Sequence, residues 1–109
     1  MEGRRLVTDA LKLNAPVKTL LVLNSALDSF SEAVQIAENA NAEIIGVSQN
    51  IIDALSETLA PEGILAVAKT QELPVITGGP LIALDCIQDP GNLGTIIRTC
   101  DAASIGGVL

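Results

Sequence analysis

The order of short apolar runs and amphipathic segments limits the chain most strongly. Three mostly apolar runs of five to seven residues have the length of buried strands. Segments with helical spacing precede and separate them. Strands alternating with helices favour a layered α/β domain with a largely parallel sheet. The expected strands are 17–23, 43–47 and 64–68.

Three amphipathic helices are expected around these strands. The first covers about residues 3–14, and the second begins at a cap formed by Asp28 or Ser29. The third begins at Ser48 and is broken by the Pro-Glu-Gly sequence at 61–63. Apolar residues at helical spacing define their buried faces. These are Leu6, Val7, Ala10 and Leu11; Phe30, Ala33, Val34 and Ala37; and Ile51, Ile52, Leu55 and Leu59.

A second structural unit is expected after the Pro- and Gly-rich segment 74–80. The predicted domains are 1–76 and 77–109. In the second, a strand at 81–85 leads into a type II turn at 89–92. A helix follows, with Leu93, Ile96, Ile97 and Cys100 on its buried face. Gly106-Gly107 ends it and a strand starts at 108–109. Such a unit cannot cover its own sheet, so it should pack on something else.

Composition and charge exclude several kinds of chemistry. The 109 residues include no His, Tyr or Trp and two Cys, which excludes imidazole catalysis and gives no reason to expect a metal site. The net charge is −7, and no basic residue lies between Lys18 and Lys69. Because Lys and Arg dominate binding to phosphates, these residues alone should bind nucleic acid weakly. No apolar run is long enough to span a bilayer and no signal peptide is recognisable, which indicates a cytoplasmic protein.

Polar residues cluster where the strand at 81–85 gives way to the following helix. In open α/β sheets, ligands bind beyond the carboxyl ends of the strands. Arg98, on the polar face of the helix, offers a planar fork for a phosphate or carboxylate. A solvated Arg98, or one paired with Asp101, is the alternative, as is a simple capping turn. The other clustered residues are Asp85, Gln88, Asp89 and Asn92.

The run 84–99, LDCIQDPGNLGTIIRT, resembles the first signature of the SpoU/TrmH family of RNA ribose 2′-O-methyltransferases, in the knotted SPOUT class. Residues 2–11, EGRRLVTDAL, and 55–67, LSETLAPEGILAV, are similar to the substrate-binding domain of that family. The resemblance implies an α/β domain like those of small ribosomal RNA-binding proteins. The start of a knotted, Rossmann-like methyltransferase domain follows it. Three residues depart from the family pattern: Glu62 replaces a frequent Gln, and Ala103 and Ser104 replace Phe and Gly.

The resemblance also implies a reaction, in which a methyl group passes from S-adenosylmethionine to a ribose 2′-hydroxyl of RNA. It makes Asn92 and Arg98 the catalytic-site residues of this chain, and it implies a homodimer formed through the complete methyltransferase domain. Because a guanidinium is a poor general base, we expect Arg98 to position a phosphate or stabilise an oxyanion. Arg4, Arg5, Gln88 and Arg98 are the candidate RNA-binding residues.

The chain is thus interpreted as an N-terminal fragment of a methyltransferase, inactive alone and without cofactor-binding residues. Two other functions stay open on the sequence. One is a non-catalytic RNA-binding adaptor, against which the acidic charge and the lack of aromatic residues count. The other is a small-anion site at the helix N-terminus near Asn92.

Overall fold

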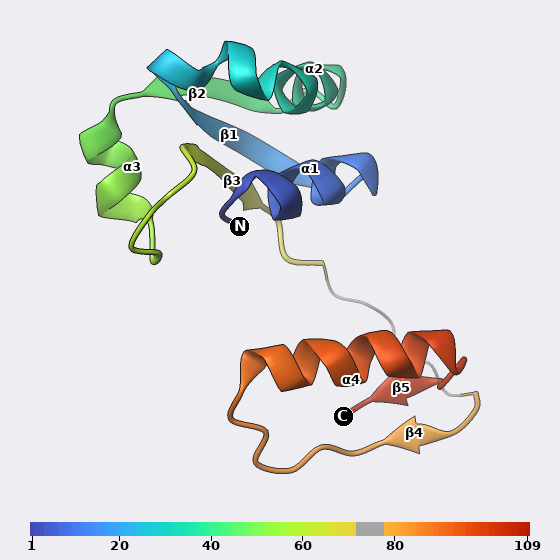
Figure 1. The fold of residues 1–109 in the computed structure, drawn as a ribbon. Coiled ribbons are helices and arrows are strands. Elements are labelled where there is room, and N and C mark those ends of the chain that lie inside the picture. The colour runs from blue at the N-terminus through green and yellow to red at the C-terminus, as the bar shows by residue number, and fades with distance from the viewer. Residues whose placement is uncertain (72–77) are drawn as a thin grey trace. The chain divides into compact units, whose positions relative to one another are not determined.

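The computed structural model describes residues 1–71 and 78–109. The chain divides into two compact units, Met1–Gln71 and Glu72–Leu109, which are described separately (Figure 1). The domain boundary expected between residues 76 and 77 lies outside the described residues.

The first unit is built on a three-stranded sheet in the order β2-β1-β3 (Figure 1). Its strands are β1 (Val17–Leu23), β2 (Glu43–Val47) and β3 (Ile64–Ala68). β1 runs parallel to β2 and antiparallel to β3. The strand positions are confirmed, but the prediction of a largely parallel sheet is wrong. The reason is the connection from β2 to β3, which starts and ends at the end of the sheet where β1 and β2 both finish, so that Ile64 pairs with Val22.

One face of this sheet is covered by α1 (Arg4–Lys12) and α2 (Ser31–Asn39). Leu20 and Val22 of β1 point into this layer and are fully buried. The predicted faces of both helices are largely confirmed, although Leu6 is exposed. The buried helix residues are Val7, Leu11, Phe30, Ala33 and Ala37.

The other face is covered by α3 (Gln49–Leu55), whose Ile52 packs with Val47 and Leu65. This helix is shorter than predicted. It ends at Leu55, well before Pro61, and Leu59 is fully exposed in the following loop. A helix of seven residues is only about 10 Å long. It therefore leaves part of the sheet face open, with Val67 55% exposed.

The ends of α1 and α2 are set by backbone geometry. A 3₁₀ turn, η2 (Asp28–Phe30), leads into α2 after the earlier η1 (Asn24–Ala26). No side chain caps α2, so the expected cap by Asp28 or Ser29 is wrong. Both helices end with an Asn in the left-handed region, Asn14 at φ 56° and Asn41 at φ 58°. Each is followed by the backbone hydrogen bonds of a Schellman motif.

The second unit consists of α4 (Pro90–Ala102) and two short parallel strands, β4 (Leu81–Ile82) and β5 (Gly107–Val108). The strand, helix and strand order is confirmed, with strands shorter or shifted by one residue. The type II turn is wrong, because α4 begins directly at Pro90 with Asp89 as its N-cap. Gly106 is required, since a Cβ there would lie 2.4 Å from the Gly78 carbonyl oxygen.

The apolar face of α4 is only partly buried. Cys100 is buried and Ile96 is half-buried, whereas Leu93 is 38% and Ile97 49% exposed. The prediction that all four residues are buried is therefore wrong for Leu93 and Ile97. The two-residue strands offer too little surface to cover a helix of 13 residues.

Candidate functional site

The start of α4 holds the polar cluster expected from the sequence. Asp89 closes the helix end, since its Oδ1 accepts a hydrogen bond of 2.6 Å from the Gly91 N–H. Pro90 occupies the first turn, where its missing N–H is no loss. Because Asp89 supplies the cap, the side chain of Asn92 is not used for it, and Asn92 is exposed. Asp85, Gln88 and Asp89 are also exposed, in the segment between β4 and α4.

Arg98 extends along α4 toward this same helix end. Its Nη2 donates to Thr95 Oγ1 at 3.1 Å, and Thr95 Oγ1 in turn donates to the Gly91 carbonyl at 2.9 Å. A Cβ on Gly94 would lie 3.2 Å from Arg98 Nη1, so the glycine makes room for the guanidinium. Over the described residues, Arg98 forms no ion pair with Asp101 and no hydrogen bond with Asn92 or Gln88. The guanidinium stays exposed, with donors left for an anion.

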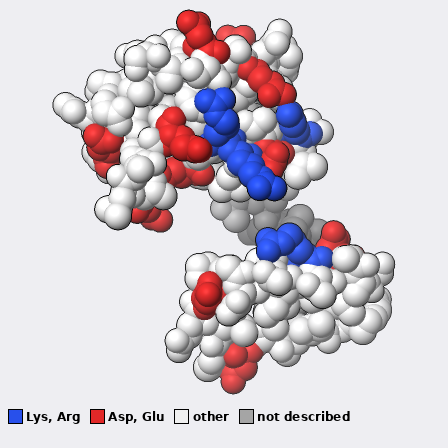
Figure 2. Space-filling model, in the orientation of Figure 1, with Lys and Arg blue, Asp and Glu red and all other residues white. Residues whose placement is uncertain are grey.

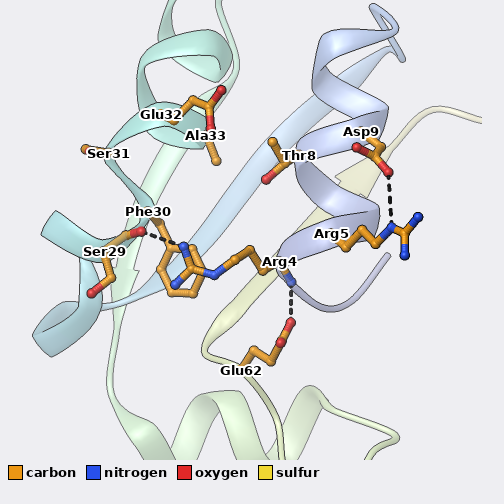
Figure 3. Close-up of a pocket in the computed structure, with 10 residues that line it drawn as sticks. All are labelled: Arg4, Arg5, Thr8, Asp9, Ser29, Phe30, Ser31, Glu32, Ala33 and Glu62. Carbon is orange, nitrogen blue, oxygen red and sulfur yellow. Dashed lines mark hydrogen bonds and ion pairs between the residues drawn. The ribbon is translucent and has the colours of Figure 1, made fainter.

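Arg4, expected to contact RNA, is committed to contacts within the first unit (Figure 3). Its Nη1 donates to the Ser29 carbonyl at 2.7 Å, and its Cζ lies 4.3 Å from the centre of the Phe30 ring. Its backbone N–H donates to the carboxylate of Glu62. Arg4 thus joins the start of α1 to η2 and to the loop before β3. Glu62 provides a cap that α1 lacks from its own residues.

The other basic residues of α1 differ in how far they are neutralised. Lys12 forms an ion pair of 2.8 Å with Glu32 of α2, and this partner raises the pKa of Lys12. Arg5 is within 3.9 Å of Asp9, and its side chain is 96% exposed. Figure 2 shows basic and acidic residues interspersed on the visible face of the first unit, without a continuous basic patch. Both predicted RNA-binding residues of this unit are exposed, but the Arg4 guanidinium is fixed by Ser29 and Phe30, so Arg5 has the freer side chain.

A pocket of about 330 Å³ lies between the first turns of α1 and the start of α2 (Figure 3). Its lining combines two guanidiniums, three carboxylates, three hydroxyls and the Phe30 ring. Sequence reasoning named Arg4 and Arg5 but missed this pocket, because η2 and α2 are about 25 residues away in the chain. The lining residues are Arg4, Arg5, Thr8, Asp9, Ser29, Phe30, Ser31, Glu32, Ala33 and Glu62.

Glu2 holds the loop that follows α3. Its carboxylate accepts hydrogen bonds from the Thr58 hydroxyl and from the Glu57 N–H, the latter at 3.1 Å. These donors, Thr58 first, lower the pKa of Glu2 below its usual value of 4.5. Glu2 and Thr58 belong to the two separate segments, 2–11 and 55–67, that resemble one family. That shared resemblance was the available signal that the two residues meet.

The described residues contain neither a group of side chains placed for a metal ion nor a membrane-spanning helix. No group of three or more His, Cys, Asp or Glu side chains is placed to hold a metal ion within residues 1–71 and 78–109. In the same part of the chain, no helix is long and apolar enough to cross a membrane.

Comparison with known proteins gives the family of the first unit. Residues 1–66 match the family described as the MRM3-like substrate-binding domain. The chain belongs to this family. The match covers the start of α1 that lines the pocket. It also covers the whole sheet of the MRM3-like domain except the last two residues of β3.

Relatives of this MRM3-like chain match across both units. The 23S rRNA (guanosine(2553)-2′-O)-methyltransferase RlmP of Bacillus subtilis is 35% identical, over all of this chain and 42% of its own length. A solved rRNA methyltransferase from Sinorhizobium meliloti matches with a TM-score of 0.74 and 30% identity, over 99% of this chain and 42% of that one. Its AdoMet-bound structure has a TM-score of 0.70, also at 30% identity, over 99% of this chain and 41% of that one.

The resemblance to the SpoU/TrmH family is thereby confirmed, and so is the α/β fold class. The chain spans about two fifths of the length of the bacterial relatives it matches.

Proposed function

We propose that this chain carries the RNA-recognition part of an rRNA ribose 2′-O-methyltransferase in its first unit. The observation that supports this most directly is the match of residues 1–66 to the MRM3-like substrate-binding domain. The relatives named as rRNA methyltransferases support rRNA as the substrate class. A cytoplasmic location is also part of the proposal, and the bacterial rRNA methyltransferase among the relatives supports it.

We propose that the second unit contributes some of the side chains that form the methyl-transfer site. In this proposal, Arg98 holds a phosphate of the target nucleotide or the developing 2′-oxyanion, using the guanidinium donors that Thr95 leaves free. Asn92 contributes one hydrogen bond from the same helix end, because Asp89 already caps α4. Gln88 contacts the RNA from the preceding segment. Since a guanidinium keeps its proton near neutral pH, Arg98 is not the base that deprotonates the hydroxyl.

S-adenosylmethionine, when bound, supplies the methyl group for this reaction. The residues around Arg98 do not by themselves fit the cofactor, because Gln88, Asn92 and Thr95 are all exposed and a ligand of that size requires an enclosing pocket. We therefore expect residues 1–109 not to bind S-adenosylmethionine. Isothermal titration checks this, and micromolar affinity would contradict it.

A homodimer of the complete enzyme is part of the proposal. The exposed apolar residues of α4, Leu93 and Ile97, support a need for further packing on this helix.

Binding of a 23S rRNA stem-loop, followed by fluorescence anisotropy at several salt concentrations, tests RNA recognition. Because few basic residues of the first unit are free of acidic partners, we expect weak binding and a shallow slope of log K against log salt, about −1 to −3. An absence of binding at low salt would refute the proposal. A much steeper slope would favour the non-catalytic RNA-binding adaptor.

Two substitutions on α1 sharpen this measurement. Arg5→Ala removes an exposed cation and should reduce the salt slope by about one unit if Arg5 meets a phosphate. Lys12→Gln is the matched control, because Lys12 is already neutralised by Glu32. Equal effects of the two substitutions would exclude Arg5 as a phosphate contact.

A further inference from the structure

The pocket beside Arg4 contains a flat group, the Arg4 guanidinium, that is already held in place. The Phe30 ring is 3% exposed and carries the Arg4 guanidinium at 4.3 Å, while the Ser29 carbonyl fixes Nη1 (Figure 3). A guanidinium held in this way is planar and already ordered. Unpaired RNA bases stack on such planes as they do on aromatic rings. A ligand that stacks here would order little of the protein on binding, which favours its affinity.

The charges around the pocket indicate which part of RNA it accepts. Three carboxylates, Asp9, Glu32 and Glu62, face two guanidiniums, Arg4 and Arg5. Lys12 neutralises Glu32 and the two guanidiniums only balance Asp9 and Glu62, so the pocket offers a phosphate of the RNA backbone no net attraction. Carboxylate oxygens instead accept hydrogen bonds from N–H groups. The ligand should therefore be a flat group with N–H donors on its edge.

Among the RNA bases, guanine fits this description best. Its Watson–Crick edge places the N1–H and N2–H₂ donors side by side, which matches the two oxygens of one carboxylate. Glu32 gives Oε1 to Lys12, and Glu62 gives Oε2 to the Arg4 N–H. Asp9 is held only by the 3.9 Å contact with Arg5. Asp9 is therefore the carboxylate with the greatest freedom to accept from a base, and Glu32 can still offer Oε2 while Oε1 is paired with Lys12.

We propose that this pocket binds one unpaired guanine base of the RNA, stacked on Arg4 and read at its edge by Asp9 or Glu32. The inference rests on the proposed RNA recognition and names the feature that the first unit reads. It explains how an acidic unit recognises RNA, because base contacts do not require an excess of positive charge.

Titration of ¹⁵N-labelled residues 1–109 with nucleosides tests the pocket directly. Guanosine should move the amide signals of Thr8, Ser31 and Ala33 in a saturable way. Inosine lacks the N2 amino group and should bind roughly tenfold more weakly, and uridine should cause no such change. Equal shifts with all three nucleosides, or none with guanosine, would overturn the proposal.

Variants identify the edge contact. Asp9→Asn or Glu32→Gln should weaken guanosine binding about tenfold, and Glu38→Gln, the same change on α2 outside this pocket, should have no effect. Circular dichroism confirms that each variant is folded. If neither Asp9→Asn nor Glu32→Gln weakens binding, the proposed readout is wrong.

The stem-loop experiment separates this inference from the proposed function. If the chain binds the 23S rRNA stem-loop while the signals of Thr8, Ser31 and Ala33 stay unmoved, the pocket proposal fails and RNA recognition stands. If the stem-loop does not bind at all, RNA recognition fails as well.

Discussion

The two units differ in how completely they bury their apolar residues. In the first unit, α1 and α2 bury a contiguous set of side chains around Leu20 and Val22 on one face of the sheet, and α3 buries a smaller cluster around Ile52 on the other face. In the second, Cys100 is the one buried hydrophobic residue among residues 78–109, at 6% exposed. The difference arises because seven-residue β1 lies between two neighbouring strands, whereas β4 and β5 form only two residue pairs. The first unit therefore has a well-buried core, whereas the second unit still exposes apolar residues of α4.

The largest expected contrast comes from matched truncations in the two cores. Leu20→Ala, at a fully buried site, should reduce the free energy of unfolding by about 3 kcal/mol. Ile97→Ala, at a residue 49% exposed, should reduce the stability of α4 by less than about 1 kcal/mol. Because the chain lacks Trp and Tyr, residue-resolved hydrogen exchange is the suitable measurement. Equal losses would mean that Ile97 is buried in solution.

Helix caps give a second contrast between the units. Asp89→Ala removes the bond to the Gly91 N–H and should destabilise α4 by about 1 kcal/mol. Ser48→Ala, at the N-cap position of α3, should change stability much less, because the Ser48 side chain makes no capping bond. Amide exchange in the first turn of each helix measures both effects. A larger loss of stability from Ser48→Ala than from Asp89→Ala would contradict the assignment of Asp89 as the stronger helix cap.

The helix ends provide a smaller effect of opposite sign. Ser104 ends α4 at φ 54°, in the region that glycine adopts without strain. Ser104→Gly should therefore stabilise the second unit by about 0.5–1 kcal/mol. Asn41→Gly in the first unit should gain less, because Asn tolerates this conformation better than Ser. Exchange of the last α4 amides should slow in Ser104→Gly, and faster exchange would contradict the prediction.

The smallest effect concerns the contact of Glu2 with the loop at Thr58. Because the pKa of Glu2 is lowered in the folded state, its ionised form stabilises the fold above pH 4.5. This contribution is lost as the pH falls through the lowered pKa. Glu2→Gln should thus be less stable than the parent chain at pH 6, and this difference should shrink as the pH falls below 4.5. Urea unfolding followed by circular dichroism measures both, and a difference independent of pH would exclude this role.

Local patterns predicted the strands and most buried helix faces correctly, because each depends on neighbours within a few residues. The direction of β3 was missed, since it depends on how far α3 carries the chain, and that helix stops at Leu55 rather than near Pro61. The burial of Leu93 and Ile97 was also misjudged. Helical spacing shows which residues share a face, whereas the surface that covers this face is a tertiary property.

The candidate site was predicted only in part. The position of Arg98 on the helix that follows β4 came from the sequence, as did Arg5 at the start of α1. The use of Arg4 to hold Phe30 and Ser29 was missed, because it depends on a contact 25 residues away. The resemblance placed Glu2 and Glu62 in the substrate-binding domain, but their hydrogen bonds to Thr58 and to the Arg4 N–H required the folded structure.

The central claim is that RNA recognition belongs to the first unit, through the start of α1 and α2. Hydrogen exchange of residues 1–109, with and without the 23S rRNA stem-loop, measures it most directly. We predict that RNA slows exchange around Arg5, Thr8 and Ser31 more strongly than in α4. Slowing confined to α4, near Asn92 and Arg98, would contradict the claim.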